Sequence, residues 1–342
     1  PPLGKAGPRE RGVRDDRRVA VTLRDIGEFP LIERLLARLP PPSARVKIGP
    51  GDDAAVSEPP PPGSVLVSTT DLLVEGVDFT AAFPARSIGW KAIAVNLSDL
   101  AAMGATPRSV LVGFAAPSST ELAWAEALYD GIGAICREHG VDVLGGDVSG
   151  VATGGVTISV TALGEAKADR VVRRSGARSG DLLCVTGTLG DAAAGLERLL
   201  AGTATGTADP LARRQLEPVP RVAAAIALAG EGLARAMIDV SDGFLADLGH
   251  LLDASRVGAR IETAKIPLSE ALAALGASAL RHALAGGEDF ELRCAVAPEN
   301  LERARAACEA GGTVLTPVGV SIIWLTVLSL GGLDIVTRAA TG

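Results

Sequence analysis

The chain has 342 residues and a net charge of -7, from 33 Lys and Arg against 40 Asp and Glu. At about 150 residues per domain, this length predicts about two domains, and a hydrophobic content of 47% suffices to give each a core. The acidic balance argues against a general nucleic-acid binder, because phosphate backbones require a basic surface. Nucleotides and small anionic substrates remain possible through local groups.

The compartment is predicted from the first residues and from the cysteines. Residues 1–22 are rich in Arg, Asp, Pro and Gly and have no apolar run, so we expect a disordered arm and no signal peptide. Four single cysteines in apolar surroundings predict core residues in a reducing environment. We therefore expect a cytoplasmic protein with no membrane partner.

The first half of the chain predicts an α+β domain over residues 23–165. Apolar residues at helical spacing predict a helix over 31–39, which three prolines end, and Ser87 and Gly104 bound a second helix over 87–103. A third helix is expected over 120–138. Strands are expected over 65–71, 110–115, 141–144 and 156–163.

The second half predicts an α/β domain over 176–320, after a connector rich in Arg, Ser and Gly at 173–180. Expected strands cover 181–186, 236–240, 259–262 and 290–296. Expected helices cover 190–200, 243–254 and 298–310. Residues 202–209 read as a low-complexity loop tip, and residues 321–342 as a divergent tail.

Aspartates recur at the ends of predicted strands or on helices, within apolar or glycine-flanked strings: Asp52, Asp53, Asp71, Asp99, Asp147, Asp239 and Asp242. Two ionised carboxylates about 4 Å apart repel by roughly 4 kcal/mol at an effective dielectric constant of about 20. Mg²⁺ would relieve that repulsion, since it prefers oxygen ligands and bridges carboxylates to substrate phosphates. The alternative is that each Asp only caps a helix or shapes a turn. No Walker or Rossmann motif is present, so phosphates would bind through metal ions, glycine amides and a helix start.

Nine strings in collinear order carry a resemblance to the thiamine-monophosphate kinase family, within the superfamily of aminoimidazole ribonucleotide synthetase. They are GEF at 27, IGPGDDAAV at 48, STTDLLVEGVDF at 68, GWKAIAVNLSDLAAMGATP at 89, LGGD at 144, RSGARSGD at 174, VTGTLGDAAAGL at 185, MIDVSDGFLADLGHLL at 237 and GGEDFEL at 286. The resemblance implies an N-terminal α+β domain whose mixed sheet pairs with its twin across a homodimer, followed by a C-terminal α/β domain.

The activity implied by the resemblance is transfer of the ATP γ-phosphoryl group to thiamine monophosphate, with several Mg²⁺ ions between the domains. Direct in-line transfer needs no strong general base, because the attacking phosphate oxygen is already ionised. This agrees with the scarcity of histidine, of which the chain has three.

The resemblance also implies roles for individual residues. Implied metal ligands are Asp53, Thr69, Thr70, Asp71, Asp99, Asp147, Asp239 and Asp242, the threonines through hydroxyl or backbone oxygen, with Asp147 and Asp239 acting in catalysis through the metal. Implied nucleotide-binding residues are Gly146, Asp147, Arg174, Ser241 and Tyr129. Asp78 and Glu288 are implied on the substrate side. Asp52 is expected either to shape its loop or to support the metal ligands from behind.

The sequence departs from the family pattern at three places. Asp78 stands where the family usually has His, and LGGDVSG replaces the usual GGDTT. The closing aromatic motif is missing after Gly319, and Trp324 is read as part of an apolar core string rather than as a thiamine-stacking residue. Two alternatives therefore remain: another ATP-dependent enzyme of the superfamily, and a catalytically weak protein that binds nucleotide or thiamine phosphates.

Overall fold

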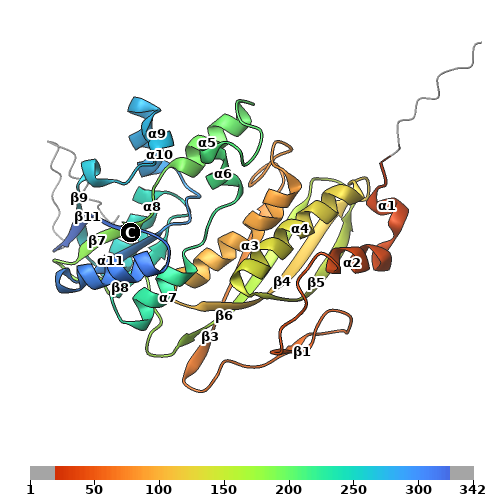
Figure 1. Ribbon diagram of the computed structural model, residues 1–342, viewed down its shortest axis with the longest axis horizontal. Helices are drawn as coiled ribbons and strands as arrows, with labels where there is room; N and C mark the ends of the chain where they lie inside the picture. Colours follow the sequence, from red (N-terminus) through yellow and green to blue (C-terminus); the bar gives the residue numbers. More distant parts are fainter. Residues whose placement is uncertain (1–19, 324–342) are drawn as a thin grey trace, which may run out of the picture.

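A computed structural model describes residues 20–323, which form two large sheets with helices packed around them and one small two-stranded sheet (Figure 1). Trp324 and the expected tail beyond it lie outside the described residues, as do residues 1–19 of the expected arm. The N-terminal part consists of α1 (Leu23–Ile26), α2 (Glu28–Leu36), β1 (Val46–Ile48), β2 (Val56–Ser57), β3 (Ser64–Val74), α3 (Ala85–Ala102), β4 (Thr106–Pro117), α4 (Leu122–His139), β5 (Asp142–Val151) and β6 (Thr157–Lys167).

The N-terminal sheet has the strand order β3-β6-β4-β5 and is mixed. Strand β6 pairs antiparallel with both β3 and β4, whereas β4 and β5 run parallel. Helices α3 and α4 cover one face of this sheet (Figure 1). The β5 strand extends past the expected residues 141–144, so that Gly146 and Asp147 lie on a strand rather than in a loop after it.

The C-terminal part contains a five-stranded sheet of order β8-β10-β7-β11-β9, in which every neighbouring pair is antiparallel. Its elements are β7 (Leu182–Thr186), α5 (Asp191–Leu200), α6 (Pro210–Leu216), α7 (Val222–Gly230), β8 (Ala234–Asp239), α8 (Phe244–Ser255), β9 (Gly258–Ile261), α9 (Glu270–Ala273), α10 (Ala279–Ala285), β10 (Leu292–Val296), α11 (Leu301–Ala310) and β11 (Leu315–Ile322), with three short 3₁₀ turns at Thr263–Lys265, Gly276–Ser278 and Pro298–Asn300. Strand β11 continues two residues into the segment expected to be a tail.

Two helices that the sequence reading did not predict, α6 and α7, follow the loop at 202–209. The last residue of that loop, Asp209, caps α6 by accepting hydrogen bonds from the backbone of Leu211 and Ala212, both at 3.0 Å. Pro210 occupies the first helical position, where its fixed φ is already helical. The low-complexity string therefore ends in a helix start.

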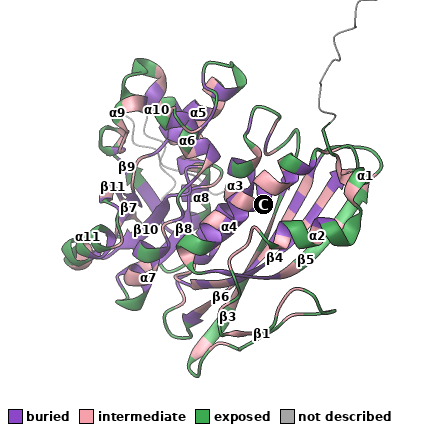
Figure 2. Ribbon diagram, turned by 45° about the vertical axis from the view of Figure 1, so that its right-hand side comes forward, coloured by how far each residue is buried: buried purple, intermediate pink, exposed green. Residues whose placement is uncertain are grey.

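Helix α3 is the central element of the molecule, because it packs against the N-terminal sheet on one side and against α6, α7 and β8 on the other. Nearly all of its residues are buried (Figure 2). Its crossing with α4 is close: a Cβ on Gly89 would lie 1.9 Å from the Leu128 carbonyl oxygen, and one on Gly131 would lie 1.8 Å from that of Arg86. Only glycine at both positions permits this separation.

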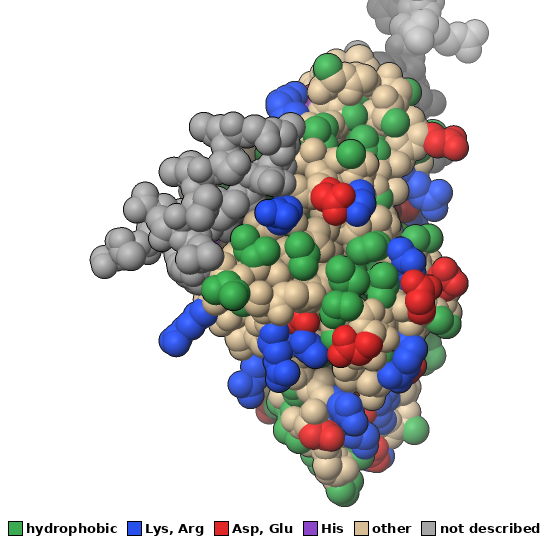
Figure 3. Space-filling view, turned by 90° about the vertical axis from the view of Figure 1, so that its left-hand side faces the viewer, with side chains coloured by type: hydrophobic (Ala, Val, Ile, Leu, Met, Phe, Trp, Pro, Cys, Tyr) green, Lys and Arg blue, Asp and Glu red, His purple; other side chains and the backbone are tan. Residues whose placement is uncertain are grey.

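The expected core role of the cysteines is confirmed, since Cys136, Cys184, Cys294 and Cys308 are all buried and free. From the side of the C-terminal part, the surface shows a central group of apolar side chains with charges of both signs around it (Figure 3). In the part of the chain that the structure describes, no helix is long and apolar enough to cross a bilayer.

Candidate active site

The first group of predicted ligands comes together where β3 meets α3. Successive residues of a strand point to opposite faces, so Thr69 and Asp71 share the face toward α3. The Thr69 hydroxyl donates to Asp99 Oδ2 at 2.6 Å. Burial, together with the carboxylates of Asp99 and Asp78, raises the pKa of Asp71 to about 6. The two neighbouring negative charges therefore disfavour ionisation of Asp71.

The C-terminal part adds Asp239, the last residue of β8, to the same group. Its side chain is 3% exposed, and Ser98 Oγ of α3 donates to its Oδ2 at 2.6 Å. Burial raises the pKa of Asp239 to about 7; the Ser98 hydrogen bond opposes this shift, and the charges of Asp99 and Asp247 add to it. The adjacent residues Ser98 and Asp99 of α3 therefore connect the acid of β3 with the acid of β8. We call Asp71, Asp99 and Asp239 the acid cluster.

Thr70 and Asp147 lie on the other face of the N-terminal sheet. The Thr70 hydroxyl donates to the Val160 carbonyl at 3.0 Å and lies 3.2 Å from the hydroxyl of Thr161. Asp147 pairs in register with Gly113, whose neighbours on β4 are buried beneath the helices, so its side chain points away from them. Thr70 could thus reach a metal beside the acid cluster only through its backbone oxygen.

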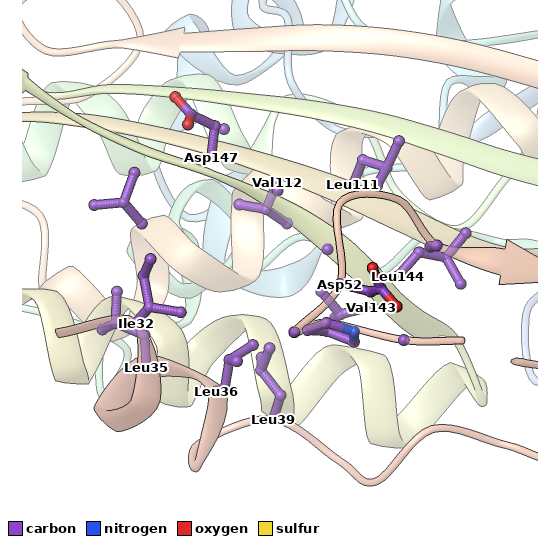
Figure 4. A pocket seen from close by; sticks show the side chains of 18 of the residues that line it. Ile32, Leu35, Leu36, Leu39, Asp52, Leu111, Val112, Val143, Leu144 and Asp147 are labelled. Carbon is purple, nitrogen blue, oxygen red and sulfur yellow. The ribbon is translucent and has the colours of Figure 1, made fainter. Parts of the chain in front are cut away.

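A pocket of about 920 Å³ lies beside the sheet edge formed by β5, between α2 and the loop at 49–55. Figure 4 shows apolar side chains of α2 facing β4 and β5 across it, with Asp147 and Asp52 at its two ends. Tyr129, Gly146 and Asp53 also line it, so three predicted nucleotide residues share one cavity with two predicted metal ligands, Asp53 and Asp147. The Asp53 amide donates to Asp52 Oδ1 at 2.8 Å, as expected if Asp52 shapes the loop.

The turn after β8 carries Ser241 and the exposed Asp242. The backbone carbonyl of Ser241 accepts a hydrogen bond from the backbone amide of Glu288 at 2.8 Å, which connects this turn to the GGEDFEL string. Glu288 has a positive φ of 66°, a conformation disfavoured for residues with a side chain. The backbone at Glu288 is therefore held by its surroundings.

The Glu288 carboxylate is already paired. Its Oε1 lies 2.6 Å from Nζ of Lys91, a residue of α3 that is 1% exposed, and Gln215 Nε2 donates to its Oε2. The Lys91 ammonium also lies 5.7 Å from the centre of the Phe83 ring. Sequence reasoning missed Lys91, Gln215 and Ser98, although Lys91 and Ser98 stand in the GWKAIAVNLSD string.

The remaining two predicted residues lie apart from these contacts. Asp78 Oδ2 accepts from the Val74 amide at 2.8 Å, so it closes the turn after β3, and its charge acts on Asp71. Arg174 is exposed on a segment beside β8: the carbonyl of its neighbour Arg173 accepts from the Met237 amide. The structure thus leaves the Arg174 side chain toward solvent.

The acid cluster fits a divalent cation chemically, since the charge of Asp99 helps to raise the pKa values of Asp71 and Asp239, and a cation would supply the opposite charge. Within residues 20–323, however, no three acidic, His or Cys side chains are placed to hold a metal ion by themselves. Mg²⁺ commonly takes only one or two carboxylates and completes its shell with water and phosphate oxygens. Any metal here would thus depend on the phosphates of a bound substrate.

Comparison with known proteins first defines the class. The N-terminal domain of AIR synthase related proteins matches residues 51–166, and the C-terminal domain of the same proteins matches residues 178–322. A crystal structure of thiamine-monophosphate kinase from Stenotrophomonas maltophilia K279a superimposes with a TM-score of 0.78 at 39% identity, covering 87% of this chain and 95% of that one. These matches confirm the two-domain fold class expected from the sequence.

Individual relatives identify the family within this class. Thiamine-monophosphate kinase of Escherichia coli (strain K12) is 40% identical over 279 residues, which cover 80% of this chain and 83% of that protein. The structure of AaThiL complexed with AMPPCP and TMP has a TM-score of 0.71 at 33% identity and covers 91% of this chain and 96% of that one. The chain belongs to the thiamine-monophosphate kinase family.

Proposed function

We propose that this protein transfers the γ-phosphoryl group of ATP to thiamine monophosphate, yielding thiamine diphosphate and ADP. The acid cluster carries the proposal, because three carboxylates held together by α3 between two domains suit a Mg²⁺-bound phosphate chain. A family member described with AMPPCP and TMP supports the two substrates.

The pocket beside β5 suits ATP. Its wall of leucine and isoleucine side chains from α2 offers an apolar surface to the base, and Tyr129, at 5% exposure, contributes an aromatic ring. Gly146 lets the chain approach closely there, since a Cβ would lie 1.8 Å from the Val112 carbonyl oxygen. Tyr129, Gly146 and Asp147 line this pocket, and we further propose that Arg174 and Ser241, which are not part of its lining, reach the nucleotide from the C-terminal part.

Several Mg²⁺ ions would supply positive charge to the phosphates. We propose as ligands Asp53, Thr69, Thr70, Asp71, Asp99, Asp147, Asp239 and Asp242, with Thr70 acting through its backbone oxygen. These residues lie on both faces of the N-terminal sheet, on α3, in the loop at 49–55, and at the end of β8 and in the turn after it, so one metal cannot engage them all. This dispersion is the reason for proposing more than one ion.

The chain's own part in the chemistry is positioning and charge. An ionised oxygen of the thiamine monophosphate phosphate attacks the γ-phosphorus of ATP; the bond from that phosphorus to the β–γ bridging oxygen breaks, and ADP leaves. No side chain needs to remove a proton. Glu288, held by Lys91 and Gln215, and Asp78 are proposed to face the thiamine part.

We also propose a homodimer formed through the uncovered face of the N-terminal sheet. Leu66 and Leu72 of β3 are each 59% exposed, and Leu111 of β4 is 39% exposed. A second copy would cover them, because exposed apolar side chains on an uncovered sheet face mark interaction surfaces. ATP as co-substrate fits the expected cytoplasmic location.

The experiment is a phosphorylation assay with ATP, thiamine monophosphate and varied Mg²⁺, in which thiamine diphosphate is measured by chromatography. Product that forms only with Mg²⁺, and is abolished by Asp71→Asn, supports the kinase. Tight binding of both substrates by calorimetry with no product would instead identify a binding protein. A phosphoryl acceptor other than thiamine monophosphate would indicate a different enzyme of the superfamily.

A further inference from the structure

Asp247, in the first turn of α8, is a buried carboxylate that is neither a proposed metal ligand nor a proposed substrate contact. Its side chain is 2% exposed. One oxygen, Oδ2, accepts three backbone hydrogen bonds, from the amides of Ser241, Asp242 and Gly243, at 3.1, 3.2 and 3.1 Å. A single carboxylate oxygen therefore organises the whole turn between β8 and α8.

That turn is also fixed from its other side. The Glu288 amide donates to the Ser241 carbonyl. Gly243 has a φ of 117°, and a Cβ there would lie 3.0 Å from the carbonyl oxygens of Ala285 and Gly286. The turn therefore has little freedom while Asp247 holds its amides, and the direction of the Ser241 and Asp242 side chains follows from it.

The charge of Asp247 has a buried counterpart in Arg293 of β10. Arg293 is 0% exposed, and its Cζ lies 3.9 Å from the centre of the Phe244 ring. Phe244 and Asp247 stand three residues apart on α8, so both face the sheet where Arg293 lies. Among the described residues, none of its three guanidinium nitrogens has a hydrogen-bond partner. A buried cation without a hydrogen bond is strongly unfavourable unless an opposite charge is near, and Asp247 is the charge that acts on it.

We propose that Asp247 is a positioning residue, which holds the Ser241–Asp242 turn in the geometry that receives Mg²⁺-bound nucleotide, and that Arg293 is its buried counter-charge. The inference rests on the proposed function for the identity of the ligand. It concerns the stiffness of the turn, which can be measured without catalysis.

The test compares the full-length wild type with Asp247→Ala, Asp247→Asn and a matched control, Asp209→Ala. Asp209 also accepts backbone amides at a helix start, but it does so at α6 and not at the turn after β8. Two quantities are measured: hydrogen exchange of the amides at 241–243 by mass spectrometry, and binding of AMPPCP by calorimetry over a range of Mg²⁺ concentrations.

Asp247→Ala is expected to speed exchange at 241–243 at least tenfold and to raise the Mg²⁺ concentration for half-maximal AMPPCP binding at least tenfold. Asp247→Asn keeps an acceptor oxygen, so both quantities should stay within about threefold of wild type. Its melting temperature should fall, because Arg293 loses its counter-charge, and adding Arg293→Met should restore at least half of the loss. Asp209→Ala should change neither exchange at the turn nor the Mg²⁺ dependence.

Unchanged exchange at 241–243 in Asp247→Ala would overturn the inference, as would wild-type Mg²⁺ dependence in that variant. If Asp247→Ala does not fold, the Asn variant decides: a wild-type melting temperature would refute the pairing with Arg293. A wild type that fails to phosphorylate thiamine monophosphate would refute the proposed function alone, and the exchange data would still decide the role of Asp247.

Discussion

Replacing Asp239 with Asn should make the metal-free protein more stable and the enzyme nearly inactive. The carboxylate is 3% exposed, and its pKa in the folded protein is raised from 3.8 to about 7. Between these two values the unfolded chain is ionised while the folded protein holds the proton. The wild type therefore loses stability as the pH rises from about 4 through about 7, and an amide, which does not ionise, avoids this loss.

The magnitude follows from the shift of about three pKa units, each worth about 1.4 kcal/mol. At about pH 8 the free energy of unfolding of the Asn variant should exceed that of the wild type by on the order of 4 kcal/mol. At about pH 5.5 the excess should be only about 2 kcal/mol, because this pH lies less than two units above the pKa of the unfolded carboxyl. The amide oxygen can still accept from Ser98, so that hydrogen bond is kept.

The assay is urea unfolding with EDTA at both pH values, followed by the kinase assay with Mg²⁺. The matched control is Asp209→Asn, since hydrogen bonds from the α6 backbone and Arg198 outweigh burial and lower the pKa of that carboxyl. This control should lose stability at about pH 8. Two results would refute the view of Asp239 as a buried, repelled carboxylate. One is an Asp239→Asn variant with a lower free energy of unfolding than the wild type, and the other is a gain in that free energy that does not change with pH.

Three further changes test the site and the assembly. Thr69→Ala should lower kcat at least tenfold, because it removes the hydroxyl that orients a cluster carboxylate, whereas Thr70→Ala should stay within about threefold; equal losses would refute the division of this string between two faces. Lys91→Met should raise KM for thiamine monophosphate at least tenfold, because it releases the Glu288 carboxylate, while KM for ATP stays within about threefold. A larger effect on KM for ATP would refute the assignment of Glu288 to the thiamine side. Leu72→Asp should convert a dimer into a monomer in analytical ultracentrifugation, and a wild type that is itself monomeric would refute the proposed interface.

The acids of the site could be found from the sequence because each stands in a distinctive string. The division between faces was less visible, although the rule that decides it is simple: within a strand, Thr69 and Asp71 face one way and Thr70 the other. Reading STTD as one ligand set ignored that alternation. The expected strand over 65–71 already contained this string, and the structure extends the strand to Val74, so the alternation applies to all four residues.

Other features depend on tertiary contacts that no local pattern contains. Lys91 and Glu288 are far apart in the chain, and a lysine inside an apolar helix gives no sign of its partner. The antiparallel pairing of the C-terminal sheet is likewise set by the path of the connections and not by the alternation of strands and helices. In contrast, α6 had a readable local signal, Asp209 before Pro210, which the neighbouring low-complexity string obscured.

Helix α3 has a consequence for the order in which the chain can fold during synthesis. Its buried Lys91 pairs with Glu288, its Ser98 donates to Asp239, and its Trp90 Nε1 donates to the Pro218 carbonyl. All three partners leave the ribosome long after the helix itself. The N-terminal half must therefore wait with one face of α3 uncovered, including a lysine that has no counter-charge, until most of the chain has been made. This interval is where the nascent protein should be most exposed to aggregation and most dependent on chaperones.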